Sequence, residues 1–198
     1  MSSIPGVVAI NTFREAVRDR VLYNLIFFAL MMIGAAILVG QISIGIERLV
    51  IENMGLSAIS SFGLIMAILI GVGLVYKEIE RRTLYSLLSK PVRRWEFLVG
   101  KYAGLLLTLL VNTALMTLGL AAALYYVSRH FERADFSILV AVYFILLELA
   151  LVTALAMFFS CFSSPMLSTL FTLGIFIAGV FAADRSEEHT SELQSRHN

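Results

Sequence analysis

Charged residues are scarce in this chain of 198 residues, where Asp, Glu, Lys and Arg together make up 15% of the sequence. An ordinary soluble domain is about 25% charged and roughly 45–50% apolar. Here 59% of the residues are hydrophobic. A soluble domain of this size buries only about 70% of its unfolded surface, so much of that apolar area would stay in water. The composition therefore excludes a cytosolic enzyme, and it excludes disorder, which requires low hydrophobicity and high net charge.

The residue types that carry catalysis or bind metals are few as well. The single cysteine, Cys161, permits no intrachain disulfide. No pair of His, Cys or carboxylate residues has the spacing of metal ligands, and the sequence contains no GxSxG, HExxH or Walker A pattern. We therefore expect no catalytic residues, no bound metal or cofactor, and no ATP site belonging to this chain. The net charge of +1 gives no indication of nucleic-acid binding.

Long apolar runs take the place of these features. A run of about 20 apolar residues is long enough to cross a bilayer core of roughly 30 Å as a helix. The runs lack the two-residue alternation of barrel strands, and a helix satisfies all of its backbone polar groups within the lipid. The runs cover residues 21–40, 56–76, 102–127, 137–160 and 165–183. The sequence thus predicts an all-α, polytopic helical membrane protein.

The distribution of Lys and Arg predicts the orientation of these spans. Cytoplasmic loops of membrane proteins are enriched in both residues. Ten of them lie before the first run or in the loop at residues 77–101, whereas the segments on the other side carry three: Arg48, Arg129 and Arg133. We therefore expect the N-terminus and the 77–101 loop to be cytoplasmic.

Residues 4–20, ahead of the first run, have the pattern of an amphipathic helix that lies in the membrane interface. Ile10, Phe13 and Val17 share one face. The opposite face carries Asn11, Arg14, Glu15 and Arg18. The alternative is a cytoplasmic extension of the first span with a partly polar surface.

The C-terminal residues 185–198 are polar throughout and have no helical apolar period. With permissible codons, residues 185–195 back-translate to the start of a common short-read sequencing adapter. We therefore interpret this tail as non-native sequence, and we expect the membrane domain to end at residue 184 and the natural chain to continue beyond it. The alternative is an ordinary exposed terminus.

The most informative segment is the loop at residues 77–104. A cluster of charges precedes Leu84, Leu87 and Leu88, which have helical spacing, and Pro91 then ends that helix. The pattern predicts a short amphipathic helix that presents charged groups to a partner. The alternative is a basic loop that only fixes the topology.

This loop resembles the corresponding loop of permease subunits of type-2 ABC exporters. In that family a carboxylate-rich start leads to a Thr-Leu helix, a Ser-x-Pro turn, an arginine, and a Gly-Lys pair that opens the third span. The matching residues are Glu78, Glu80, Thr83, Leu84, Ser89, Pro91, Arg93, Arg94, Gly100 and Lys101. Residues 11–20 resemble the elbow helix of the same family, whereas Arg82 stands where the family often has glycine.

The resemblance implies a permease subunit without its own ATPase activity, in a bacterial or archaeal cytoplasmic membrane. ATP and Mg would be bound by a separate ABC ATPase subunit, and two permease copies, identical or different, would pair across the bilayer. The family has six spans, of which five are visible here. The implied docking residues for the ATPase subunit are Arg14, Arg18, Glu78, Glu80, Arg81, Thr83, Leu84, Pro91 and Arg93.

Among Asp, Glu, Lys, Arg and His, the five apolar runs contain a single residue, Glu148. A carboxylate inside a span is costly and marks a functional site by default. Glu148 lies about 18 Å and Asn112 about 16 Å from the same membrane side, by the 1.5 Å rise per residue. We therefore expect one of two arrangements. Either the two side chains form a hydrogen bond between adjacent helices, or Glu148 faces the translocation path.

Two other functions remain open from the residues. An ion- or proton-coupled carrier would use Glu148, but such carriers have inverted repeats and interrupted spans, and the sequence has neither. A membrane assembly subunit would have no transport cycle. The exporter, unlike both, predicts a neighbouring ATPase gene.

Overall fold

The computed structural model describes residues 4–42, 45–80, 94–128 and 135–197, and these residues are almost entirely helical. The helices are α1 (Ile4–Val17), α2 (Arg20–Ile42), α3 (Glu47–Glu80), α5 (Arg94–Ser128), α6 (Asp135–Ser160) and α7 (Pro165–His197). The described part contains no strand. The prediction of an all-α fold is confirmed.

Among the described residues, five helices are long and apolar enough to cross a membrane, in agreement with the five predicted spans. Their candidate membrane segments are Leu22–Ile42, Glu47–Gly73, Trp95–Val127, Ser137–Ser160 and Pro165–Ala182. Two helices begin two turns or more before their apolar runs: α3 begins at Glu47 instead of residue 56, and α5 at Arg94 instead of residue 102. The helical backbone of α7 also continues past residue 183 into the polar tail.

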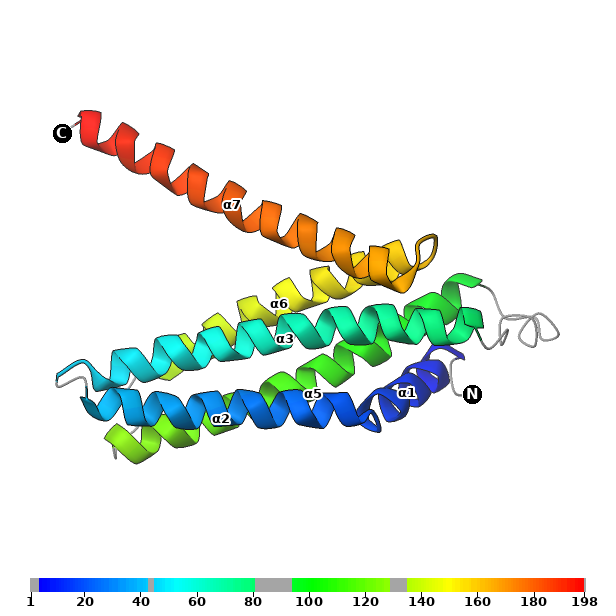
Figure 1. Cartoon of the computed structure of the whole chain (residues 1–198), viewed down its shortest axis with the longest axis horizontal. Coiled ribbons are helices and arrows are strands. Elements are labelled where there is room, and N and C mark those ends of the chain that lie inside the picture. Colours follow the sequence, from blue (N-terminus) through cyan, green and yellow to red (C-terminus); the bar gives the residue numbers. More distant parts are fainter. Residues whose placement is uncertain (1–3, 43–44, 81–93, 129–134, 198) are drawn as a thin grey trace.

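The helices α2, α3, α5 and α6 run along the long axis of the molecule (Figure 1). The helix α3 packs against α2, α5 and α6, and is therefore the central element of the bundle. We call one end of the bundle the elbow end: it holds α1, the last turn of α3, the first turn of α5 and the α6–α7 turn (Figure 1). At the opposite end α2 connects to α3, where Gly45 adopts a φ of +89°, a left-handed conformation that glycine adopts without strain.

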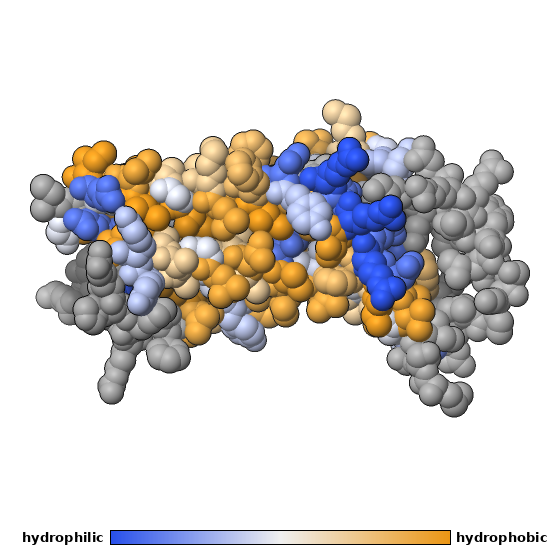
Figure 2. Space-filling view, turned by 90° about the horizontal axis from the view of Figure 1, so that it is seen from below, coloured by the Kyte–Doolittle hydropathy of each residue, from blue (hydrophilic) through white to orange (hydrophobic). Residues whose placement is uncertain are grey.

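The surface of the bundle is mostly hydrophobic between its two ends. Figure 2 shows this apolar surface on one face, bounded near the elbow end by a band of hydrophilic residues. Large apolar side chains on α2, α5 and α6 are exposed, as expected of helices whose outer surface meets lipid.

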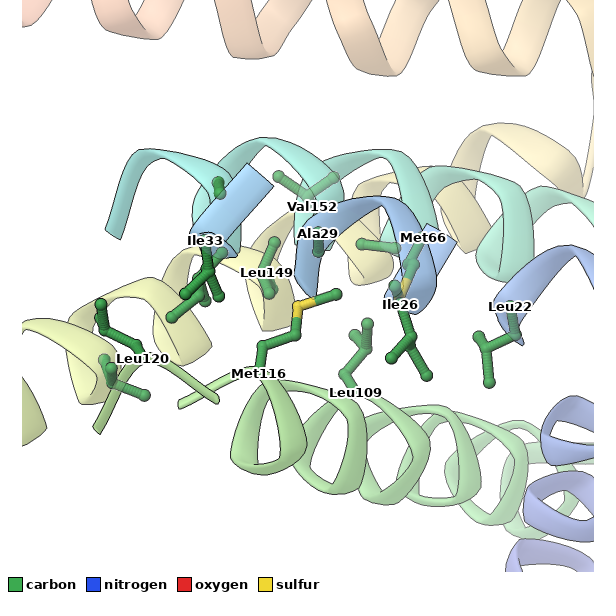
Figure 3. Packing of buried hydrophobic residues seen from close by; sticks show 14 of the residues in the cluster. Leu22, Ile26, Ala29, Ile33, Met66, Leu109, Met116, Leu120, Leu149 and Val152 are labelled. Atoms are coloured by element: carbon green, nitrogen blue, oxygen red, sulfur yellow. The ribbon is translucent and has the colours of Figure 1, made fainter. Parts of the chain in front are cut away.

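The core lies where α2, α3, α5 and α6 meet (Figure 3). Its residues are Leu, Ile, Met, Val and Ala, with almost no exposed surface. Figure 3 labels Leu22, Ile26, Ala29, Ile33, Met66, Leu109, Met116, Leu120, Leu149 and Val152 from these four helices. This apolar core gives the four helices one common packing centre.

Small residues bring α3 close to α6. A Cβ atom added at Gly71 would lie 2.9 Å from the Cβ of Ala156, and one added at Gly63 would lie 2.7 Å from a methyl carbon of Leu149. Between the two glycines, Ala67 is fully buried. The four-residue spacing of these small residues therefore serves packing within the chain.

The helix α1 makes an equally close contact with the start of α5. A Cβ atom added at Gly104 would lie 2.5 Å from the carbonyl oxygen of Ala9, and one at Gly100 would lie 2.8 Å from that of Pro5. Thr12 of α1 is buried beside Gly104. Only glycine leaves room for the two backbones at this distance.

As a result α1 has three faces instead of the two expected from its sequence. The small residues, among them Thr12 and Ala16, face α5 and are buried. Ile10, which we expected on the apolar face, is 53% exposed and lies apart from the contact with α5. The polar residues of α1, Asn11, Arg14 and Glu15, are exposed on the remaining side, as is Arg18 in the turn that follows.

We predict that Gly104→Ala weakens the contact between α1 and α5. Overpacking costs about 1–3 kcal/mol, and the better helix propensity of alanine returns at most about 1 kcal/mol of it. The thermal unfolding midpoint of the purified protein should fall. The matched control is Gly174→Ala in α7, where an added Cβ meets nothing within 4 Å. Equal midpoints for the two variants would contradict the close contact.

Candidate docking surface and intramembrane polar residues

The two arginines predicted for docking are both exposed: Arg14 on α1, and Arg18 in the turn directly after it. They belong to the polar side of this segment, at the elbow end of the bundle (Figure 1). Gly100 and Gly104 allow close contact between α1 and α5. The backbone that carries the two arginines is therefore held in place against the bundle. We call this exposed polar side of α1 and of the turn after it (Asn11, Arg14, Glu15 and Arg18) the elbow face.

The other predicted docking residues belong to the same end of the molecule or to the segment that follows it. Glu78 and Glu80 lie in the last turn of α3, which ends at the elbow end together with the first turn of α5 (Figure 1). The remaining five lie outside the described residues: Arg81, Thr83, Leu84, Pro91 and Arg93. The structure thus places α1 and the two ends of the predicted docking loop on one side of the bundle.

Lys101, the lysine of the Gly-Lys pair, is an unexpected feature of this end. Its side chain is only 3% exposed, although it is a cation. The ammonium nitrogen lies 5.5 Å from the ring centroid of Phe97, one turn earlier on α5. A cation above an aromatic face is stabilised by the ring quadrupole, which offsets part of the cost of burial. The position of Lys101 in the sequence did not indicate that its side chain is buried, because it stands next to a glycine at the start of a span.

Asn112 is buried in the bundle core, with 5% of its surface exposed. Its side-chain amide donates a weak hydrogen bond to the sulfur of Met66 on α3, at 3.8 Å. Among the described residues, no hydrogen bond joins Asn112 to Glu148. The structure therefore does not form the expected interhelical pair.

The direction of Glu148 around the axis of α6 explains why the pair is not formed. Two residues of α6 face α5: Met157 packs with Leu105, and the carbonyl of Ala150 accepts a hydrogen bond of 3.0 Å from the Tyr102 hydroxyl. At about 100° per residue, Glu148 lies on nearly the opposite side of α6. Similar depth in the membrane is therefore not sufficient for contact.

Buried hydroxyl groups in the spans are satisfied mostly within their own helices. Thr108 donates to the carbonyl of Gly104 at 2.9 Å, and Thr153 to that of Leu149 at 2.7 Å. Ser160 instead crosses to α3 and donates to the carbonyl of Val72 at 3.3 Å. Among the described residues, no buried side-chain oxygen or nitrogen lacks a partner. These hydroxyls stabilise the bundle and do not form a prepared polar site.

Four phenylalanines surround the α6–α7 turn. The rings of Phe158 and Phe162 have centroids 5.2 Å apart, and the ring of Phe159 lies 5.5 Å from that of Phe171 on α7. Cys161 lies in this turn and is exposed. The aromatic contacts fix the start of α7 against the end of α6.

We predict that Asn112→Leu leaves the thermal midpoint unchanged or raises it. The substitution exchanges one weak contact with sulfur for apolar packing of similar shape. Leu109→Asn, one turn earlier in the same core, is the converse variant, because it places an unpartnered amide among apolar side chains at a cost of about 1–3 kcal/mol. A marked loss of stability in Asn112→Leu would show that the amide has a stronger partner.

Comparison with known proteins gives one family match. Residues 7–197 match the family described as ABC-2 family transporter protein. No curated protein matches the chain. The family match covers α2, α3, α5, α6 and α7 completely, together with most of α1.

Proposed function

Because the chain belongs to the ABC-2 family of transporter proteins, we propose that it is the permease subunit of a transporter driven by a separate ATPase subunit. The chain is a multi-pass membrane protein and a membrane transport component. The observation that carries the proposal is the family match across all five candidate spans. In this proposal the chain forms the path for the substrate, and the partner subunit binds ATP and Mg.

The elbow face is the proposed docking surface, together with the loop that follows Glu80. The exposed guanidinium groups of Arg14 and Arg18 offer charge-assisted hydrogen bonds to carboxylates on the ATPase subunit. Glu78 and Glu80 add the opposite sign at the same end of the bundle. This mixture of charges favours one orientation of a partner over others.

The close contact of α1 with α5 supports a route for the coupling between the subunits. A displacement of α1 would move α5 as well, because the backbones of the two helices are in close contact at Gly100 and Gly104. In the proposal, ATP-driven closure of the ATPase subunits shifts α1 and α5 as one body, and the spans of two paired permease copies change together.

We further propose that the elbow end is cytoplasmic. The support is the excess of Lys and Arg before α2 and between α3 and α5. The helix α1, the last turn of α3 and the first turn of α5 all lie at this end (Figure 1). The cytoplasmic membrane of a bacterium or archaeon is the proposed location, because the ATPase subunit needs cytoplasmic ATP.

Reversal of both charges on the elbow face, Arg14→Glu with Arg18→Glu, should abolish co-purification with the ATPase subunit. The measurement is the amount of ATPase recovered with the tagged permease. Both side chains are exposed, so the thermal midpoint of the permease should change little.

The matched control is Arg129→Glu with Arg133→Glu, which reverses two charges in the segment predicted to face the other side of the membrane. It should leave the recovery of ATPase unchanged. Full recovery with the elbow variant, or equal loss with both variants, would contradict docking at the elbow face.

Cys161 allows a direct test of the orientation, because it is the only cysteine and is exposed at the elbow end. A membrane-impermeant maleimide should not label it in intact cells and should label it after permeabilisation. A second protein, with Cys161→Ser and Arg129→Cys, should be labelled in intact cells. The reverse pattern would place the elbow end outside.

A further inference from the structure

The helix α7 packs against the bundle only along its first part. Ser168 and Thr172 are fully buried, and Phe176 is half-buried against the core. From Ile177 to Ala182 every side chain is exposed. Figure 1 shows the cause, since α7 diverges from α6 and α3 towards the opposite end of the bundle. The outer half of α7 therefore leaves uncovered the side of α6 that its inner half covers.

Glu148 lies on this side of α6. Phe159 follows it by about three full helical turns, so the two residues share a face. The ring of Phe159 packs against Phe171 of α7, 5.5 Å away. Nearer the elbow end this face of α6 is thus covered by α7. Glu148 lies 12 residues before the end of α6 at Ser160, and 12 residues past the start of α7 at Pro165 its exposed stretch begins, at Ile177.

The surroundings of Glu148 are apolar and partly aromatic. Phe144, one turn before it, is 63% exposed, and Leu151, about one turn after it, is exposed as well. Glu148 itself is half-buried, and among the described residues no hydrogen bond or ion pair to its carboxylate is formed. A carboxylate at this depth is costly without a partner, and the chain's own described side chains supply none.

We propose that the face of α6 around Glu148, opposite the diverging half of α7, binds a membrane-soluble organic cation. The ligand class is a positively charged nitrogen or phosphorus centre that carries apolar substituents. The carboxylate of Glu148 supplies the opposite charge, and Leu151 contacts the apolar substituents. Phe144 offers an aromatic ring to the cation, an interaction that strengthens when water is excluded.

Charge and polarity together select this class. An anion would meet the carboxylate as a like charge, and a neutral lipid would leave it unpaired. A small hydrated cation would lose its water without gaining other oxygen ligands, because the neighbouring side chains are hydrocarbon. An apolar cation loses little hydration and enters sideways from the bilayer.

The inference rests on the proposed function, in which the bound cation is the transported substrate or a competitor for its site. The test uses the complex of the permease with its ATPase subunit, in nanodiscs of neutral phosphatidylcholine. The probe is radiolabelled tetraphenylphosphonium, and binding is corrected for empty nanodiscs. We expect saturable binding that the neutral analogue triphenylphosphine oxide does not displace.

Glu148→Gln should weaken this binding at least about tenfold, the effect expected when a poorly solvated ion pair becomes a neutral contact. Glu148→Asp should retain most of it, since the charge is kept. Absence of saturable binding to the unaltered complex, or equal binding by Glu148→Gln, would overturn the proposal.

A second pair of variants keeps the test independent of the carboxylate. Phe144→Ala should weaken binding about three- to tenfold through loss of the aromatic contact. Phe27→Ala removes a ring on α2 that is equally exposed, at 63%, and should have no effect. Equal affinities in these two variants would remove Phe144 from the site and contradict the proposed face.

The two proposals fail in distinguishable ways. A complex that assembles and hydrolyses ATP but does not bind the cation contradicts only the site at Glu148. Failure of the permease to associate with any ATPase contradicts the proposed function. In that case, binding of tetraphenylphosphonium to the permease alone still tests whether the site at Glu148 exists.

Discussion

Close approach of helix backbones at glycine is the constraint on which this bundle depends. Lipid is as apolar as leucine, so burial of leucine does not hold helices together inside a bilayer, and close packing must do so. Gly104 against Ala9, Gly71 against Ala156 and Gly63 against Leu149 provide that packing. The same glycines set the architecture: they place α3 at the centre and α1 directly on α5. The apolar side chains of the core then fill the space that these contacts define.

The number of membrane helices was predictable from the sequence because it follows from composition and length alone. Five apolar runs became five candidate spans, and the pattern of residues 4–20 correctly indicated a helix before the first span. The third face of α1 was not predictable in this way. Its residues, such as Ala9 and Ala16, are too small to stand out in an apolar period, and their role depends on the glycines of a helix about a hundred residues later.

The polar residues within the spans show a second limit of inference from sequence. Depth along a helix follows from counting residues, and this placed Asn112 and Glu148 in the same zone. Rotation around the helix axis depends on which neighbours pack where, and Asn112 contacts Met66 of α3 while Glu148 lies on the far side of α6 from α5. The predicted docking residues also fall into two groups, those that the structure describes and those that it does not. Arg14 on α1 and Arg18 just after it are exposed, and their docking role stays a prediction. The positions of Arg81, Thr83, Leu84, Pro91 and Arg93 lie outside the described residues.

The four phenylalanines at the α6–α7 turn attach α7 to the bundle near one of its ends. The helix is held by Phe171 at the turn and by Ser168, Thr172 and Phe176 further along, and its side chains from Ile177 to Ala182 are exposed. Its apolar segment of 18 residues is about 27 Å long, so a tilt of about 10° at the turn moves the far end by about 5 Å. Such a tilt would also displace Ser168, Thr172 and Phe176, which pack against the bundle nearer the turn. Because displacement grows with distance from the turn, the exposed end of α7 would move much further than these packed residues.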